Sequence, residues 1–358
     1  MPGVAVMDYD EGDYDYRNFW RGRDFEHRTE TVALSRLLSG QLSRGLPDGR
    51  ADWFVDLGGG FGRHLPTYRR FARRVVLVDR SLTNLRNAAA DPAAAGVDLV
   101  RADVYRLPLR DRAFDAGACV RLLHHLTDLD AALAEMGRVV DRNWLLDVPI
   151  HHHLQSRLRS FPARAARTPR LLGSWEDPYW NFHLAAVRDR LSLLGWATRT
   201  AASLHNLRGL PIPGPVARPL ESVLQRAGRS WWGPSQFVLA ERPGARGRPQ
   251  PADGVEALLV CPACRGELRF DGPSAGCAAC ALEYRRDGGI WDFVRALPLR
   301  RPHLTGPHGT VQVSTGGVAG AVPAPRTTVL ATPPGAIRPP QYGLDTVGAE
   351  SVPPATPL

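Results

Sequence analysis

The chain has 358 residues, enough for one full α/β domain and a smaller module. Hydrophobic residues make up 44% of it, which excludes a mostly disordered protein, and no run approaches the ~18 apolar residues of a membrane-spanning helix. The net charge of +9 would favour an anionic partner, but all 45 basic residues are arginine. That bias is typical of a GC-rich genome, so we give the charge little weight as evidence for nucleic acid.

The first 50 residues begin with an acidic, tyrosine-rich segment and continue into a predicted helix over Thr29–Leu42, where apolar residues recur at helical spacing. We expect residues 1–50 to form a helical cap. Met1–Tyr16 lacks the basic-then-apolar order of a signal peptide, so we expect a cytoplasmic protein with no membrane partner.

Residues 51–242 alternate short apolar runs with amphipathic stretches, notably Ala131–Val140 and Phe182–Leu194. This alternation is typical of βαβ units and predicts a doubly wound, mostly parallel, seven-stranded Rossmann-like α/β sheet that ends in an antiparallel strand. The expected strands are Trp53–Asp56, Val75–Asp79, Asp98–Ala102, Ala116–Val120, Trp144–Val148, Ala197–Ala201 and Gln236–Glu241.

A glycine-rich loop follows the first of these strands, with Gly58, Gly60 and Gly62 behind Asp56. Glycines at this place let the backbone turn sharply and approach a ligand. A dinucleotide fingerprint would need glycine at relative positions 1, 3 and 6, which the loop does not supply because Arg63 occupies the sixth position from Gly58. A P-loop needs lysine, and the chain has none.

The spacing acid-x-Gly-x-Gly-x-Gly resembles motif I of class I S-adenosylmethionine (SAM)-dependent methyltransferases. Asp79 ends the next strand, where a carboxylate can accept hydrogen bonds from both hydroxyls of a ribose. Asp103-Val104 follows the third strand, where this family places an acid near the adenine amino group. The segment Phe114–Leu126, with Leu107-Pro108 before it, resembles the small-molecule branch. The resemblance covers residues 50–150 and implies that SAM is held by Asp56, Gly58, Gly60, Gly62, Asp79, Asp103 and Val104.

Methyl transfer from a sulfonium needs an oriented acceptor and, for some acceptors, a general base. Our candidate base is His125, just past the fourth strand, although it could equally pack against the sheet. Some phosphobase methyltransferases, which this segment resembles, use a histidine in a similar His-Leu context. His151–His153 follows the fifth strand and is interpreted as a loop rather than a metal site. Arg23 could reach a ligand carboxylate, but a surface arginine is the simpler interpretation.

Four of the five cysteines form two Cys-x-x-Cys pairs, Cys261/Cys264 and Cys277/Cys280, separated by twelve residues. Such turns present four thiolates to one tetrahedral ion, so we predict a structural zinc site, with iron or two disulfides as alternatives. The frame Leu258–Ile290 resembles Trm112-like zinc ribbons, which activate or accompany methyltransferases of RNA and translation factors. We expect a linker at 243–256, the ribbon at 257–298 and a disordered tail at 299–358.

We therefore expect an enzyme, a SAM-dependent methyltransferase acting on a small molecule. Methylation of ribosomal or transfer RNA or of a translation protein is the alternative, and a non-catalytic scaffold is the third reading. For a small acceptor, residues 151–180 and 203–234 should close over a pocket with the aromatic side chains of Trp175, Tyr179, Trp180, Trp231 and Trp232.

Overall fold

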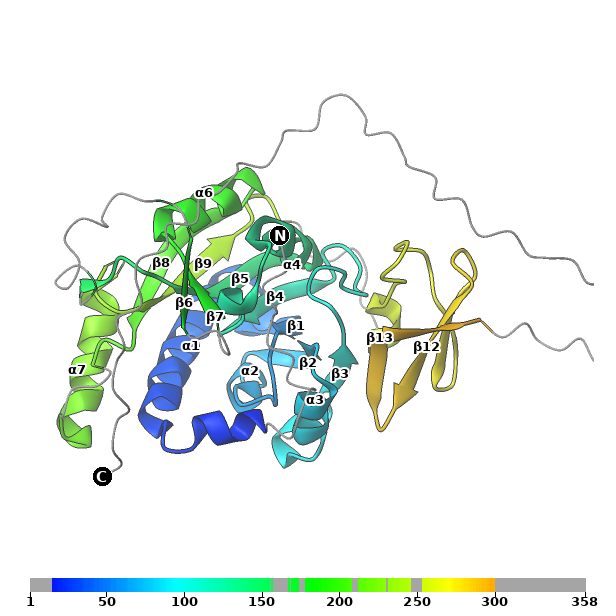
Figure 1. The fold of residues 1–358 in the computed structure, drawn as a ribbon, viewed down its shortest axis with the longest axis horizontal. Helices are drawn as coiled ribbons and strands as arrows, with labels where there is room; N and C mark the ends of the chain where they lie inside the picture. Colours follow the sequence, from blue (N-terminus) through cyan, green and yellow to red (C-terminus); the bar gives the residue numbers. More distant parts are fainter. Residues whose placement is uncertain are drawn as a thin grey trace, which may run out of the picture. The chain divides into compact units, whose positions relative to one another are not determined.

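The computed structural model describes residues 15–154, 156, 167, 169–173, 178–207, 212–229, 231–245 and 253–299 (Figure 1). The predicted tail, apart from Leu299, lies outside these residues, and so does Trp175.

The helical segments are η1 (Tyr16–Trp20), α1 (Asp24–Gly45), η2 (Pro47–Gly49), α2 (Leu65–Tyr68), α3 (Leu82–Ala89), η3 (Pro92–Ala94), η4 (Leu123–His125), α4 (Leu129–Val139), α6 (Leu184–Leu193), α7 (Gly214–Ala227) and η6 (Val255–Leu258). The strands are β1 (Ala51–Leu57), β2 (Ala72–Asp79), β3 (Asp98–Arg101), β4 (Phe114–Cys119), β5 (Val140–Pro149), β6 (Arg170–Gly173), β7 (Pro178–Asn181), β8 (Ala197–Leu204), β9 (Ser235–Glu241), β10 (Arg269–Asp271), β11 (Ser274–Cys277), β12 (Leu282–Asp287) and β13 (Ile290–Pro298).

The main sheet runs in the order β10-β11-β12-β13-β3-β2-β1-β4-β5-β9-β8. Each of the seven expected strands is present between Ala51 and Glu241, and β9 is antiparallel to both of its neighbours. The expected total of seven is nevertheless wrong, because the sheet has eleven strands. The added four belong to residues 255–299, here called the β-module.

The β-module joins the sheet through a parallel pairing of β13 with β3. Leu99, Val100 and Arg101 lie opposite Ile290, Trp291 and Asp292. Strand β3 would otherwise be an edge strand with unpaired backbone groups, which is the kind of surface that accepts a further strand. Hydrophobic patterning within each segment does not encode this pairing, because the partners are nearly 200 residues apart.

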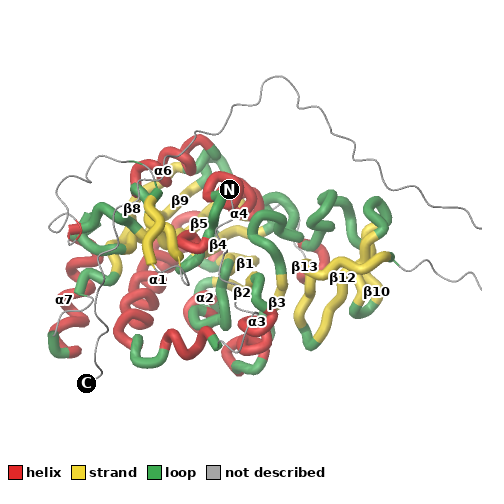
Figure 2. Tube along the Cα trace, in the orientation of Figure 1, coloured by secondary structure: helices red, strands yellow, loops and turns green. Residues whose placement is uncertain are grey.

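Helices cover both faces of the central strands, as expected for a doubly wound sheet (Figure 2). Along β1, the buried Phe54 joins the core layer beneath α1 and α3, whereas Trp53 and Val55 join the opposite layer, which contains α4 residues. The second layer also contains Tyr284 and Trp291 of the β-module. The β-module therefore shares its core with the α/β region rather than building a separate one.

A two-stranded hairpin, β6–β7, was not predicted. It lies against η4, where the ring of Tyr179 meets that of His124 edge-on at 6.5 Å. The helix expected at Phe182–Leu194 is α6, which begins two residues later.

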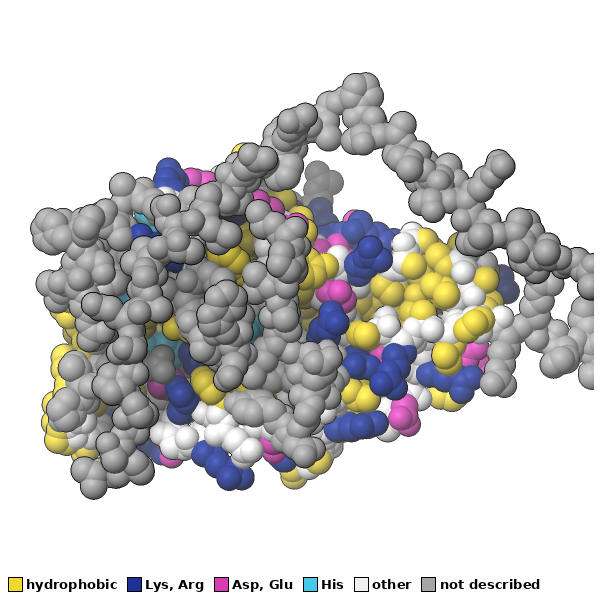
Figure 3. All heavy atoms as spheres, in the orientation of Figure 1, with side chains coloured by type: hydrophobic (Ala, Val, Ile, Leu, Met, Phe, Trp, Pro, Cys, Tyr) yellow, Lys and Arg dark blue, Asp and Glu magenta, His cyan; other side chains and the backbone are white. Residues whose placement is uncertain are grey.

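None of the described helices combines the length and the apolar character needed to cross a bilayer. Over the β-module, the space-filling view shows arginine, acidic and hydrophobic side chains interspersed (Figure 3). That face therefore carries mixed charge.

Candidate functional site

The glycine-rich loop leaves β1 through a backbone path that side chains rarely adopt. Gly58, Gly60 and Gly62 have φ values of 71°, 58° and 80°. A Cβ atom on Gly58 would lie 2.7 Å from the Leu122 side chain, and one on Gly62 would lie 2.6 Å from that of Leu65. The loop thus requires glycine for both its turn and its close packing.

Asp79, the last residue of β2, is fixed at the mouth of this loop. Its Oδ2 accepts a hydrogen bond of 2.8 Å from the Gly60 N–H, and its Oδ1 accepts one of 2.9 Å from the Ser81 N–H. Ser81 in turn caps α3, because its hydroxyl oxygen accepts the Asn84 N–H at 3.1 Å. The carboxylate is therefore held in place by the loop and the helix start and retains acceptor capacity.

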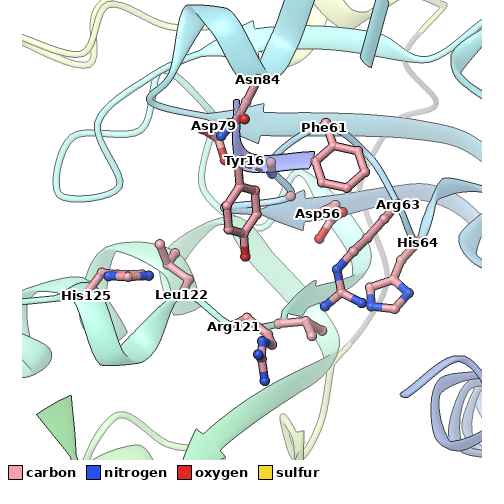
Figure 4. Close-up of a pocket in the computed structure, with 14 residues that line it drawn as sticks. Tyr16, Asp56, Phe61, Arg63, His64, Asp79, Asn84, Arg121, Leu122 and His125 are labelled. Carbon is pink, nitrogen blue, oxygen red and sulfur yellow. Dashed lines mark hydrogen bonds between the residues drawn. The ribbon is translucent and has the colours of Figure 1, made fainter. Parts of the chain in front are cut away.

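A pocket at this edge of the sheet brings several of the sequence-predicted residues together (Figure 4). Asp56, Gly58, Gly60, Asp79 and His125 all line it. They come from β1, the glycine loop, β2 and η4, whose carboxyl-terminal ends meet at one edge because β1 is parallel to both β2 and β4.

Three of the predicted residues do not line the pocket. Gly62 belongs to the glycine turn, where its φ of 80° is needed, but it does not border the pocket. The Oδ1 of Asp103 accepts the Tyr105 N–H at 2.9 Å, and its Oδ2 lies 3.7 Å from the Arg80 guanidinium. The Asp103 side chain is 38% exposed, and Val104 packs partly buried against the core.

Asp56 is buried beneath the loop, close to Asp79. Burial, with a smaller contribution from the neighbouring Asp79 charge, raises the pKa of Asp56 to about 7. A carboxyl group with this pKa gains or loses its proton near neutral pH.

The N-terminal segment supplies a pocket residue that the sequence analysis missed. Tyr16, in η1, lines the pocket, stacks on Phe19 with ring centroids 5.7 Å apart, and meets Phe61 edge-on at 5.9 Å. The run of aromatic residues before α1 was the available signal, because aromatic side chains so close together need an apolar surface to cover.

Two arginines, Arg63 and Arg121, also line the pocket and were missed. The guanidinium of Arg63 lies over the Trp20 ring at 3.8 Å, and that of Arg121 lies 5.1 Å from the same ring. Arg23, the arginine considered from the sequence, does not line the pocket; it pairs with Glu26 at 3.3 Å.

Both pocket arginines are anchored by one carboxylate, Glu30 of α1, which is completely buried. Glu30 forms an ion pair with Arg63 and lies 3.7 Å from Arg121. The rings of His64 and His205 approach it to 3.3 and 3.2 Å. Burial alone would raise the pKa of Glu30, but Arg63 and the two histidines hold it well below its usual value.

The histidines of the predicted site have different surroundings. His125 lines the pocket, and the ring of His124 lies 3.9 Å from it. Burial lowers the pKa of His124 well below its ordinary value. His152 stacks on His183 at 4.5 Å, away from the pocket lining.

The aromatics expected to close the pocket do not line it where the structure describes them. Tyr179 contacts His124, Trp180 packs against the core, and Trp231 and Trp232 meet each other at 5.0 Å.

The four predicted metal ligands converge in the β-module. The Sγ atoms of Cys261, Cys264, Cys277 and Cys280 all lie within 4.8 Å of one another, and among the described residues this is the one such group that could hold a metal ion. All four are free thiols. The Tyr284 hydroxyl lies 3.5 Å from the Cys261 sulfur, and the Gly266 N–H points to the Cys264 sulfur at 3.4 Å.

Ion pairs and backbone bonds fasten the β-module to the α/β region. Arg101 on β3 pairs with Asp292 at 3.0 Å, and the Val260 N–H donates to the Pro108 carbonyl at 2.9 Å. Arg110 forms a two-pronged contact with Glu267. These contacts flank Asp103 and Val104, so the β-module braces the segment predicted to meet adenine.

Comparison with known proteins agrees with this geometry. Residues 55–144 match the family described as Methyltransferase domain. Over 121 residues the chain is 34% identical to the demethylmenaquinone methyltransferase of Thermobifida fusca (strain YX). That match covers 33% of this chain and 47% of the relative, so the chain spans about half the length of the curated relative it matches.

Two solved structures are similar at low identity. A SAM-dependent methyltransferase from Thermotoga maritima has 16% identity and a TM-score of 0.41, covering 63% of this chain and 96% of its own. The magnesium protoporphyrin IX methyltransferase of Synechocystis PCC 6803 with bound SAH has 16% identity and a TM-score of 0.41, covering 65% of this chain and 90% of its own.

Proposed function

We propose that the chain is a SAM-dependent methyltransferase acting on a small molecule, with residues 51–242 as the catalytic domain. The observation that carries the proposal is the meeting of a glycine turn with Asp79 in one pocket, within the residues that match the methyltransferase domain. A non-catalytic scaffold would not need this arrangement.

The pocket residues divide according to the parts of the ligand. The Asp79 carboxylate accepts the two ribose hydroxyls with the lone pairs that Gly60 and Ser81 leave open. The glycine turn lets the backbone approach the methionine part, and the guanidinium of Arg121 attracts its carboxylate. Asp103 and Val104 lie outside the pocket lining, just past the end of β3, and would meet the adenine from the segment braced by the β-module.

When bound, SAM supplies a methyl group on a sulfonium, which is already activated for transfer. The protein therefore has to hold an acceptor in line with that methyl group and to exclude water. His125, on the η4 side of the pocket, accepts the acceptor's proton or orients its nucleophilic atom. The apolar Leu122 and Val120 beside it shield that side of the pocket from solvent.

A small acceptor is favoured over RNA by the curated relative that the chain matches. The β6–β7 hairpin packs against η4, where Tyr179 contacts His124 beside His125. The matched curated relative is named for a quinone-type acceptor, which is a small molecule. Methylation of RNA or of a translation protein remains the second candidate, because the cysteine frame resembles Trm112-like ribbons.

We further propose that residues 257–298 of the β-module form a zinc ribbon, following a linker at residues 243–256. Zinc bound tetrahedrally at ~2.3 Å from each sulfur places the sulfurs ~3.8 Å apart. The Cys264 and Cys277 sulfurs are 3.6 Å apart, and the whole set lies within 4.8 Å, so the residues fit the ion. Cysteines that bind zinc rather than form disulfides are typical of a reducing compartment, so we propose that the protein acts in the cytoplasm.

The test is calorimetric titration of the full chain with SAM and with S-adenosylhomocysteine. Asp79→Ala should weaken binding by roughly 1.5–3 kcal/mol, because two ribose hydroxyls lose a charged acceptor. The matched control is Asp189→Ala, an exposed aspartate of α6, which should leave affinity unchanged. Equal affinity for Asp79→Ala and the wild-type chain would overturn the proposal.

A second experiment distinguishes a small-molecule acceptor from RNA. The chain is incubated with labelled SAM and either a metabolite extract or total RNA. Label in the metabolite fraction supports the proposal. Label in RNA, with RNA binding that weakens steeply as salt rises, would replace it by the second candidate.

A further inference from the structure

Helix α7 turns an apolar stripe outward. Val216, Leu220 and Val223 follow one another at spacings of four and three residues, so they share one face of the helix. Their side chains are 56%, 39% and 60% exposed. Three branched apolar residues in a row on one helix face normally pack against a core, and here they face away from it.

Polar contacts fix this rotation of the helix. On the buried face, the Glu221 carboxylate accepts a hydrogen bond of 2.8 Å from the Asn206 side-chain amide. One turn later, the Gln225 side-chain amide donates to the Thr29 carbonyl of α1 at 3.0 Å. Because buried polar groups must keep their partners, α7 cannot roll over to bury its stripe without breaking both contacts.

The neighbouring helix also carries an exposed apolar side chain. Val32 of α1 is 48% exposed, and α1 packs beside α7. Trp231, just beyond the end of α7, is 37% exposed. In the space-filling view, hydrophobic side chains lie along the side of the molecule on which α7 is drawn (Figure 3).

Arginines flank this surface. Arg226 of α7 and Arg229 just beyond its end are exposed, whereas the one acidic residue of α7, Glu221, is buried. Arg36 of α1 lies close enough to Arg226 and Arg229 that burial and their charges lower its pKa. The surface therefore combines an apolar stripe, an aromatic side chain and clustered positive charge.

We propose that this α7–α1 surface docks on an anionic phospholipid membrane. Acidic headgroups pair with the arginines, and Val216, Leu220 and Val223 sink into the boundary between headgroups and acyl chains, as the apolar faces of interfacial helices do. Trp231 suits the headgroup level, where aromatic rings with a polar atom gather. The phosphates of an RNA would pair with the arginines, but an RNA would leave the apolar stripe exposed to water.

This contact is peripheral and needs no spanning helix. The expectation of no membrane partner rested on the absence of a long apolar run and of a signal-peptide pattern, and neither criterion tests a surface helix. The proposal is independent of methyl transfer, since it concerns a face formed by α1 and α7 and not the pocket.

The experiment is flotation of the full chain with vesicles of phosphatidylcholine, with and without phosphatidylglycerol. We expect binding only to the anionic vesicles, weakening as salt is raised. A stripe variant (Val216→Ser, Leu220→Ser, Val223→Ser) and an arginine variant (Arg226→Gln, Arg229→Gln) should each lose at least ~tenfold in binding. The matched control combines Leu193→Ser on α6 with Arg86→Gln on α3, both exposed elsewhere, and should bind like the wild-type chain.

Circular dichroism and SAM titration of each variant show whether it remains folded. Absence of binding to the anionic vesicles by the wild-type chain would overturn the proposal, as would undiminished binding by the folded stripe variant. Self-association that disappears in the stripe variant, without vesicle binding, would assign the surface to a second copy of the chain instead. Salt-sensitive RNA binding that depends only on the arginines would also contradict it.

Discussion

The pocket beside the glycine loop and the cysteine cluster of the β-module hold their groups in opposite ways. In the pocket, Asp79 is oriented by backbone amides above a large core that exists without any ligand. In the β-module, Cys261 and Cys277 are themselves among the buried core residues. Loss of the ligand should therefore leave the first site intact and loosen the second, because the ion is what cross-links the two Cys-x-x-Cys turns, while Tyr284 and Trp291 stay packed in the core shared with the α/β region.

The largest effect should come from the cysteines. Replacing Cys277 and Cys280 by serine should remove the metal and expose the amides of residues 269–299 to hydrogen exchange, since structural zinc supplies ~10–16 kcal/mol in small metal-dependent domains. Metal analysis and exchange mass spectrometry measure both. The control is Cys119→Ala, which removes a cysteine of the buried strand β4, outside the cluster. The β-module of this variant should retain its metal. Well under one equivalent of metal in the wild-type protein would contradict the site.

The next largest effect tests whether interactions within the protein stabilise the pocket without a ligand. Glu30→Gln should lower the free energy of unfolding by about 3–5 kcal/mol, because it leaves the buried charges of Arg63 and Arg121 without their shared partner. Urea unfolding measures it. Glu26→Gln, which removes a less buried neighbour, should cost less. If both variants have the same urea midpoint of unfolding as the wild-type chain, Glu30 does not anchor the arginines.

A smaller effect concerns the attachment between the two regions. Asp292→Ala should cost about 1.5–3 kcal/mol, because Arg101 is almost fully buried and loses a charged hydrogen bond. Glu267→Ala is the matched control at the same interface. Its side chain is 73% exposed, so its pair with Arg110 should contribute no more than about 1 kcal/mol. Equal costs in denaturant unfolding would argue against a buried attachment.

The smallest effect is the pH dependence that Asp56 imposes. Its pKa of about 7 in the folded chain lies above the usual aspartate value, so the folded state binds a proton that the unfolded state has released. Stability should then fall by about 1.4 kcal/mol as pH rises from ~6 to ~8, by the linkage of proton binding to folding. Asp56→Asn should remove that part of the slope. An unchanged slope in unfolding experiments across this range would contradict a raised pKa.

Local signals in the sequence explain why much of the α/β region could be predicted. Each of its strands is an apolar run next to a turn or helix, so the positions of these strands along the chain rest on patterns that a short window contains. Asp56, Gly58 and Asp79 could also be predicted from local patterns, because they lie at the ends of such strands. The four cysteines could be predicted from their spacing in the sequence.

The features that were missed depend on contacts between distant segments. Glu30 occupies a position that could equally be a solvated helix face, and only the folded chain brings Arg63, Arg121 and His205 around it. Tyr16 lines the pocket beside the glycine loop, although it lies more than 40 residues before that loop in the sequence. The predicted placement of Asp103 and Val104 depends on a bound ligand, so it stays a prediction.

The pairing of β13 with β3 also has a consequence for solubility. Strand β3 consists of Asp98, Leu99, Val100 and Arg101, and its last three residues are buried. Bare sheet edges of this kind recruit strands from other molecules, which is a route to aggregation. By occupying that edge with its own chain, the protein fills a position that a neighbouring copy could otherwise take. A chain shortened to end before residue 255 would present that edge to its neighbours, and it should aggregate even if its pocket were perfectly formed.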